Sequence, residues 1–192
     1  MHATRNVNTI AVIGARAAGR EIARAAVMGG YRTVIEDVSP ELVKEAMQYV
    51  QEALQKAVAG GGMTTDEKNA ATARLSTAPT VEDACRRADV LLEAGPEELE
   101  LKFEIFTLFD RFARPGAILA SNTSSIPITD LAHMTFRGEN CIGMHFTGGA
   151  ARQYTVKITR GQETSDATVA ACMEMARRMG REVEMAIERV NG

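Results

Sequence analysis

The chain has 192 residues, of which 45% are apolar and 24% are charged, so it is long enough to bury one sizeable core. Its net charge of −3 and its scattered lysines and arginines argue against nucleic acid or an anionic membrane surface as a partner. No run approaches about 18 uninterrupted apolar residues, so we expect no membrane span.

The three cysteines, Cys85, Cys141 and Cys172, are far apart and lack the C-x-x-C spacing of zinc or redox sites. We therefore expect free thiols, a reducing cytoplasmic location and no metal site.

Patterns typical of strands and helices alternate from the first residues onward. A long helix is expected after the second strand, because Ser39 is a preferred N-cap residue and Pro40 suits the first helical position. Up to residue 80 the sequence predicts a strand at 9–14, a helix with the stripe Ala18, Ile22, Ala25 and Gly29, a strand at 31–38, helices at 39–62 and 64–75, and an extended segment at 75–80.

The second half continues the alternation but contains more strands. Its predicted elements are strands at 88–95, 116–122, 140–146, 154–159 and 181–188, a helix at 98–113 with Leu101, Ile105, Leu108 and Phe112 along one side, and a capped helix at 165–180. This order predicts an α/β fold with a Rossmann-like, doubly wound and mostly parallel sheet. Beyond about residue 115 we expect an antiparallel or mixed edge.

The turn after the first strand has two of the three glycines of the dinucleotide pattern G-x-G-x-x-G. Gly14 and Gly19 permit the tight turn and close helix packing, whereas Arg16 stands where a glycine lets the backbone approach a pyrophosphate. Asp37 ends the second strand, where an acid accepts hydrogen bonds from a ribose 2′-OH and favours NAD over NADP. Two interpretations of Arg16 stay open. Its side chain pairs with the phosphates from a displaced position, or its presence means that the turn no longer holds a dinucleotide.

Four segments together resemble the NAD-binding domain of the 3-hydroxyacyl-CoA dehydrogenase family. They are 10–41, LLEAGPEELELK at 91–102, ILASNTSSIPIT at 118–129 and IGMHF at 142–146, in the family's order over nearly the whole chain. The resemblance implies NAD as cofactor, an acyl-CoA substrate, and oxidation of its 3-hydroxyl group to a ketone, a reaction of fatty acid metabolism.

The resemblance also implies roles for individual residues. His145 corresponds to the histidine that removes the hydroxyl proton, a task suited to a group that titrates near neutral pH. Ser124 corresponds to a substrate-contacting serine, Asn122 to a residue close to the cofactor, and Glu93 and Lys102 to positions at the nicotinamide end. The alternatives are structural: a core or edge position for His145, capping of the next turn by Asn122, Ser124 and Ser125, and a solvated helix charge at Lys102.

Several features depart from the family pattern. Lys157 stands twelve residues after His145, where the family has a glutamate that orients the imidazole. Gly148 and Gly149 replace an Asn-Pro pair, and the sequence ends at IERVNG, where the family continues into a helical domain. We expect residues 1–192 to form the NAD-binding domain alone.

Three functional hypotheses follow from these observations. The first is an NAD-dependent dehydrogenase completed by a separate chain that supplies the helical half. The second is a non-catalytic nucleotide-binding or regulatory module of the same fold. The third is reduction of another acyl or keto substrate with Lys157 as proton donor. The sequence leaves the oligomeric state and the acyl chain length open.

Overall fold

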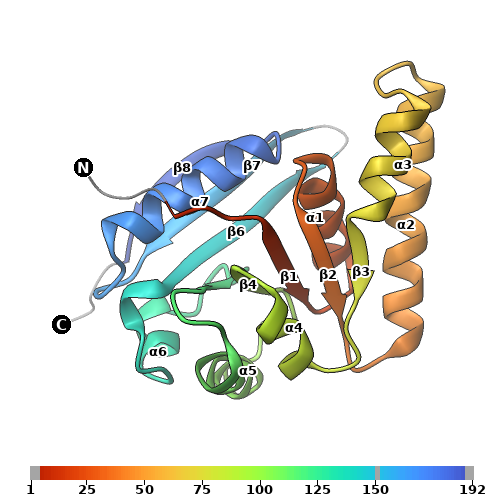
Figure 1. Ribbon diagram of the computed structural model, residues 1–192. Helices are drawn as coiled ribbons and strands as arrows, with labels where there is room; N and C mark the ends of the chain where they lie inside the picture. The colour runs from red at the N-terminus through yellow and green to blue at the C-terminus, as the bar shows by residue number, and fades with distance from the viewer. Residues whose placement is uncertain (1–4, 150–151, 189–192) are drawn as a thin grey trace.

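The computed structural model describes residues 5–149 and 152–188, and in this part of the chain eight strands form one sheet (Figure 1). The sheet order is β3-β2-β1-β4-β5-β6-β7-β8. Neighbouring strands from β3 to β6 run parallel, β7 is antiparallel to β6, and β8 is parallel to β7. The strands are β1 (Thr9–Ile13), β2 (Arg32–Glu36), β3 (Leu75–Thr77), β4 (Val90–Glu93), β5 (Ile118–Ser121), β6 (Cys141–Gly149), β7 (Arg152–Arg160) and β8 (Glu182–Ile187).

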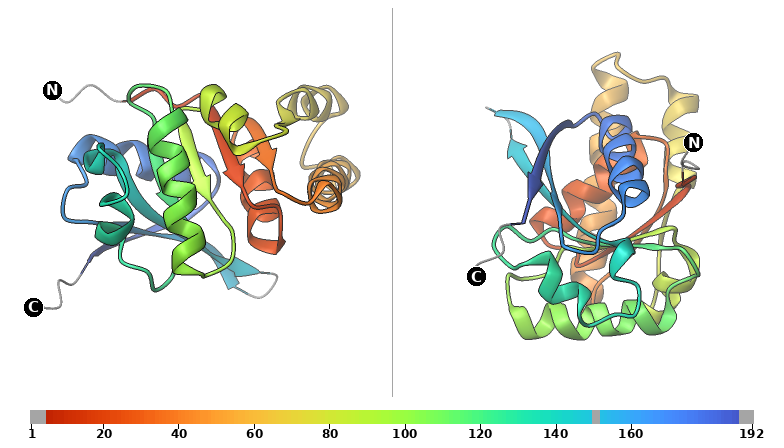
Figure 2. Two further views of the ribbon diagram at one scale, coloured as in Figure 1. Left: turned by 90° about the horizontal axis from the view of Figure 1, so that it is seen from below. Right: turned by 90° about the vertical axis from the view of Figure 1, so that its left-hand side faces the viewer.

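Helices cover both faces of the sheet, as the two further views show (Figure 2). Helices α1, α2 and α7 share one apolar core with the strands, and α4, α5 and α6 share a second core on the opposite face. Helix α3 packs against α2 and α1. The helices are α1 (Ala17–Met28), α2 (Pro40–Ala59), α3 (Thr65–Ala73), α4 (Val81–Arg87), α5 (Leu99–Phe112), α6 (Ile128–Ala132) and α7 (Asp166–Arg178), with a short 3-10 helix at Gly138–Asn140.

Local sequence signals explain where several helices begin. The N-cap residues Ser39, Thr64, Thr80 and Ser165 each accept a hydrogen bond from a backbone N–H in the first turn of α2, α3, α4 and α7. At α3, Glu67 also reaches back to the N–H of Thr64, which completes a capping box. These caps satisfy N–H groups that have no partner within the helix.

The predicted α/β fold with an antiparallel edge is confirmed, and three details of the prediction are wrong. The helix α4 was not predicted, because it has only seven residues. Within the predicted extended segment 75–80, only Leu75–Thr77 forms a strand. Ala18 is exposed rather than part of the buried stripe of α1.

The third detail concerns the buried face of α5. This face consists of Lys102, Ile105, Phe106 and Phe109, whereas Leu101, Leu108 and Phe112 are only partly buried. Leu101 and Leu108 line a surface groove, and Leu101 and Phe112 also pack against the edge of the core. The buried lysine in this face has a carboxylate partner from β4, which a count of apolar residues does not reveal.

Candidate dinucleotide and catalytic site

The turn between β1 and α1 needs both of its glycines. Gly14 has a φ of +103°, and a Cβ atom there would lie 2.9 Å from the carbonyl group of Ala94 and from the N atom of Gly95. A Cβ atom on Gly19 would lie 1.8 Å from the carbonyl oxygen of Gly14. The spacing therefore forms the tight turn that the motif predicts, and contact of these glycines with a cofactor stays a prediction.

Arg16 lies directly before α1 in an extended conformation that any residue adopts (φ −68°, ψ −170°). Its side chain is exposed and forms no ion pair with another residue in the described ranges, so neither Asp37 nor Glu93 holds it. Helix α1 has no side-chain cap and no acidic residue in its first turn. The exposed, positively charged Arg16 thus directly precedes the positive end of α1, and this arrangement suits an anion.

Asp37 follows β2 and is fixed beside the same turn. Its Oδ2 atom accepts a hydrogen bond from the N–H of Ala15 (2.8 Å), and its Oδ1 atom accepts one from the N–H of Ser39 (2.9 Å). A carboxylate has about four acceptor positions, so the half-buried Asp37 keeps capacity for a ribose hydroxyl.

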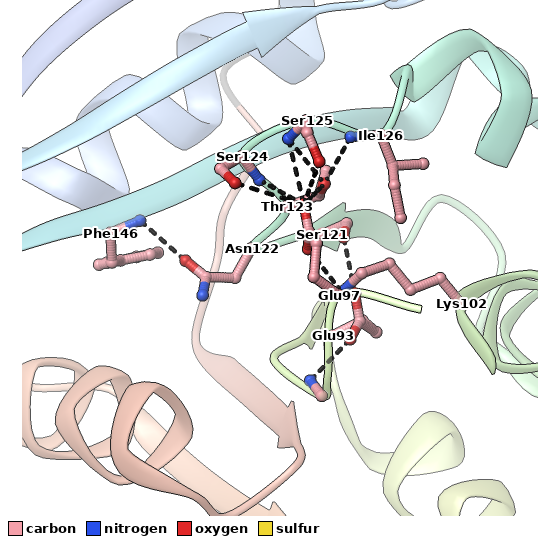
Figure 3. Close-up of polar contacts among 11 residues, drawn as sticks. Glu93, Glu97, Lys102, Ser121, Asn122, Thr123, Ser124, Ser125, Ile126 and Phe146 are labelled. Carbon is pink, nitrogen blue, oxygen red and sulfur yellow. Dashed lines mark hydrogen bonds and ion pairs between the residues drawn. The ribbon is translucent and has the colours of Figure 1, made fainter. Parts of the chain in front are cut away.

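A buried ion pair lies beneath the ends of β4 and β5 (Figure 3). The Nζ atom of Lys102 is 2.7 Å from Oε2 of Glu93, and both side chains are fully buried. Glu93 also accepts hydrogen bonds from the Oγ atom of Ser121 (2.6 Å) and from the N–H of Gly95 (2.6 Å). The alternative of a solvated charge at Lys102 is therefore wrong, and the roles of Glu93 and Lys102 toward a cofactor stay predictions.

The serine loop, which we define as residues 122–126, is held by Glu97. Its Oε1 atom accepts hydrogen bonds from the Oγ1 atom of Thr123 (2.6 Å), the N–H of Ser124 (2.9 Å), and the N–H and Oγ of Ser125 (3.1 and 2.9 Å). Burial alone raises the pKa of Glu97, but these hydrogen bonds outweigh it and lower the pKa to about 2. Glu97 was not predicted as a site residue, and the available signal is an acid just after Gly95 at the end of a buried strand.

The capping expected within the serine loop is provided by a different residue. The Oγ1 atom of Thr123 accepts hydrogen bonds from the N–H groups of Ser125 and Ile126. The Oδ1 atom of Asn122 instead accepts one from the N–H of Phe146 in β6 (2.8 Å), as Figure 3 shows. Asn122 therefore links β5 to the strand segment that carries His145.

His145 and Lys157 are direct partners in the antiparallel pair β6–β7. Side chains of directly opposed residues lie on the same face of a sheet, so the ammonium group and the half-buried imidazole are neighbours. A cleft of about 680 Å³ is lined by Ser124 and Lys157, among other residues, whereas His145 does not line it. Gly148 has a φ of +123°, and the strand register shifts between Thr147 and Gly149.

The cysteines are free thiols, as predicted, and all three are buried. Burial raises the pKa of Cys85 and Cys172 to about 12 and that of Cys141 to about 11, so the thiols are neutral at physiological pH. In the described part of the chain, no cluster of three His, Cys, Asp or Glu side chains is arranged to hold a metal ion. Among the same residues, no helix combines the length and apolar character needed to span a membrane.

Comparisons with known proteins show what the chain as a whole is similar to. The sequence profile of the family described as "3-hydroxyacyl-CoA dehydrogenase, NAD binding domain" matches residues 9–188. A probable 3-hydroxybutyryl-CoA dehydrogenase of Bacillus subtilis is 35% identical over 175 residues, which cover 91% of this chain and 61% of the relative. A 3-hydroxybutyryl-CoA dehydrogenase of Bradyrhizobium diazoefficiens is 34% identical over 180 residues, which cover 94% of this chain and 61% of the relative.

Among solved structures, the (S)-3-hydroxybutyryl-CoA dehydrogenase of Ralstonia eutropha superposes with a TM-score of 0.88 at 31% identity. The match covers 96% of this chain and 65% of that protein. The chain thus spans about 61% of the length of the two curated relatives named above.

Proposed function

Because the chain belongs to the 3-hydroxyacyl-CoA dehydrogenase family, whose NAD-binding domain it matches, its cofactor is NAD, and we propose that it binds NAD at the Gly14–Gly19 turn for the oxidation of a 3-hydroxyacyl-CoA. The observation that carries this proposal is the exposed Arg16 beside the uncapped start of α1. The side chain in the middle position of the motif leaves the turn open and adds a positive charge for the diphosphate.

The residues around the turn fit the other parts of the cofactor. The carboxylate of Asp37, which is held beside the turn by the N–H of Ala15, is proposed to accept a hydrogen bond from the adenosine ribose and to repel a 2′-phosphate. Asn122, Glu93 and Lys102 support the nicotinamide end, the last two as positioning residues because their side chains are fully buried. When bound, NAD accepts the hydride that leaves the substrate.

We propose that the reaction takes place beside the cleft that Ser124 lines, with His145 acting from the adjacent strand β6. A neutral nitrogen of the His145 imidazole takes the proton of the 3-hydroxyl group, and the hydroxyl of Ser124 holds the substrate oxygen. Glu97 fixes the position of Ser124 through its N–H group. We place the acyl-CoA pocket on a helical domain outside residues 1–192, supplied as a separate chain or as further sequence. The expected setting is fatty acid metabolism in the cytoplasm, consistent with three free thiols.

A second candidate, a non-catalytic nucleotide-binding module, is favoured by one observation. Lys157 lies opposite His145, and an ammonium group neither orients an imidazole nor stabilises its protonated form. In this case the chain binds NAD but supports no turnover, even when a helical domain is present.

A titration with NADH, followed by calorimetry, tests the cofactor site. We expect saturable binding by the unmodified chain and weaker binding of NADPH. Gly19→Ala is expected to abolish NADH binding, because the new Cβ atom collides with the backbone of Gly14. Gly62→Ala is the matched control, since its Cβ atom would be 3.7 Å from its nearest neighbour. Absence of NADH binding by the unmodified chain, or binding unchanged in Gly19→Ala, contradicts the proposal.

Reduction of acetoacetyl-CoA separates the two candidates. The chain is assayed alone and together with the helical half of the Bacillus subtilis relative, produced as a separate chain. Turnover that requires the added half supports the dehydrogenase. NADH binding without turnover in either assay supports the non-catalytic module.

A further inference from the structure

A second groove opens at the carboxyl ends of β1, β2 and β4, beside α4 and α5. Its volume is about 320 Å³, and it reaches Gly14, Arg16 and Asp37, so it is continuous with the dinucleotide turn. Most of its wall is apolar and comes from Ile13, Val38, Val81, Leu101, Ile105 and Leu108. A wall of this kind suits a flat, weakly polar group such as a purine base.

One buried carboxyl group interrupts the apolar wall. Glu36 is the last residue of β2, lines the groove and is only 3% exposed. Its side chain has no hydrogen bond or ion pair with another residue that the structure describes, and an unpaired buried carboxylate is costly. Burial, together with the negative charge of Asp37, raises the pKa of Glu36 to about 7. Near neutral pH the carboxyl group is therefore protonated in about half of the molecules.

Among the described residues that line the groove, Arg16 is the one cation, and its side chain is exposed. From α5 the groove is faced by the exposed Glu104, and from α4 the buried thiol of Cys85 lies near Glu36. The thiol stays neutral because burial, with a smaller effect of the Glu36 charge, raises its pKa to about 12. Of the two acids in the groove, Asp37 disfavours ionisation of Glu36.

A protonated carboxyl group and an adenine base have matching hydrogen-bonding groups. The acid offers one O–H donor and one carbonyl acceptor, and adenine offers a ring nitrogen acceptor beside its amino donor. Glutamine, which also offers one donor and one acceptor side by side, pairs with adenine in the same way. An ionised carboxylate has no donor and leaves the ring nitrogen without a partner.

We propose that Glu36 recognises the adenine base of NAD in its protonated form, so that cofactor binding takes up a proton and weakens as the pH rises above neutral. This inference rests on the proposed NAD site and adds to it a base-recognising residue and a dependence on pH. Asp37 contacts the ribose in that site, whereas Glu36 faces the adjoining apolar groove.

The expected change in NADH affinity with pH follows from the fraction of molecules in which Glu36 is protonated. The apparent Kd equals the intrinsic value divided by the protonated fraction of Glu36, so it rises about thirtyfold between about pH 6 and about pH 8.5. In Glu36→Gln the side-chain amide donates a hydrogen bond at every pH. We therefore expect tight NADH binding, with an apparent Kd that changes less than about threefold over the same pH range. Glu104→Gln, which removes an exposed acid of the same groove, is the matched control and should keep the thirtyfold change.

Calorimetric titration with NADH in two buffers of different ionisation enthalpy measures the proton directly. At about pH 7.5 the unmodified chain should take up about 0.8 proton per NADH, and Glu36→Gln should take up none. Binding by the unmodified chain with constant affinity and no proton uptake overturns the inference and leaves the NAD site standing, as does an unchanged pH dependence in Glu36→Gln. Failure of both proteins to bind NADH at any pH overturns the proposed function and the inference together.

Discussion

Two lysines lie in the candidate site, Lys102 in α5 beneath the serine loop and Lys157 in β7 opposite His145, and their surroundings are opposite. Lys102 is fully buried, with its Nζ atom 2.7 Å from Glu93 and 3.5 Å from Glu97. Lys157 is exposed and lies opposite His145 without an ion pair to a described residue. The first lysine contacts two carboxylates, one of which holds the serine loop, whereas the second lies opposite an imidazole in the neighbouring strand.

The largest expected difference between the two regions is in stability. Lys102→Ala leaves Glu93 buried without its charge partner, so we expect the free energy of unfolding to fall by about 3–5 kcal/mol. Lys157→Ala, the matched control, removes an exposed charge and should change the free energy of unfolding by about 0.5 kcal/mol or less. Urea denaturation at neutral pH measures both. Equal losses of unfolding free energy in the two variants would contradict the difference between a buried, paired lysine and an exposed one.

The next effect concerns catalysis. Lys157→Glu places a carboxylate opposite His145, where it can orient the imidazole and stabilise its charged form. In the assay with the added helical half, we expect kcat to rise about a hundredfold, equivalent to about 2.7 kcal/mol of barrier. Lys157→Ala separates removal of the ammonium from addition of the carboxylate. A kcat for Lys157→Glu no higher than that of Lys157→Ala rules out an orienting role at this position.

The smallest effect is local to the serine loop. Glu97→Gln removes the charge that accepts hydrogen bonds from Ser124 and Ser125, at an expected cost of about 1.4 kcal/mol. Amide hydrogen exchange at Ser125 should become about tenfold faster. The amide of Phe146, which Asn122 holds, serves as the internal control and should not change. Uniform acceleration at both amides indicates global destabilisation and contradicts a local role.

Much of the fold follows from sequence patterns because the signals are local. Ser39 and Pro40 mark the start of α2, and the apolar runs mark the strands of a sheet covered on both faces. The short helix α4 escaped prediction because its seven residues are too few for a clear helical period. The buried position of Lys102 escaped because its partner Glu93 belongs to another element, and only the packing of α5 on β4 brings them together.

Some residues of the candidate site could be predicted from the sequence, and others could not. Gly14, Gly19 and Asp37 follow from a motif with fixed spacing, and the turn they form agrees with it. Glu97 and Glu36 carry no motif, and their surroundings come from residues distant in sequence. An acid inside or just after an apolar strand is the available signal for both. Such a residue needs a partner, a ligand or a proton.

The central claim is that the Gly14–Gly19 turn accepts a diphosphate although Arg16 occupies the middle position. Amide chemical shifts of the isotopically labelled chain, recorded by NMR during titration with NADH, test it residue by residue. We expect saturable shifts concentrated at Ala15–Gly19 and Asp37. Saturation with those amides unmoved, or no shift at any NADH concentration, would contradict it.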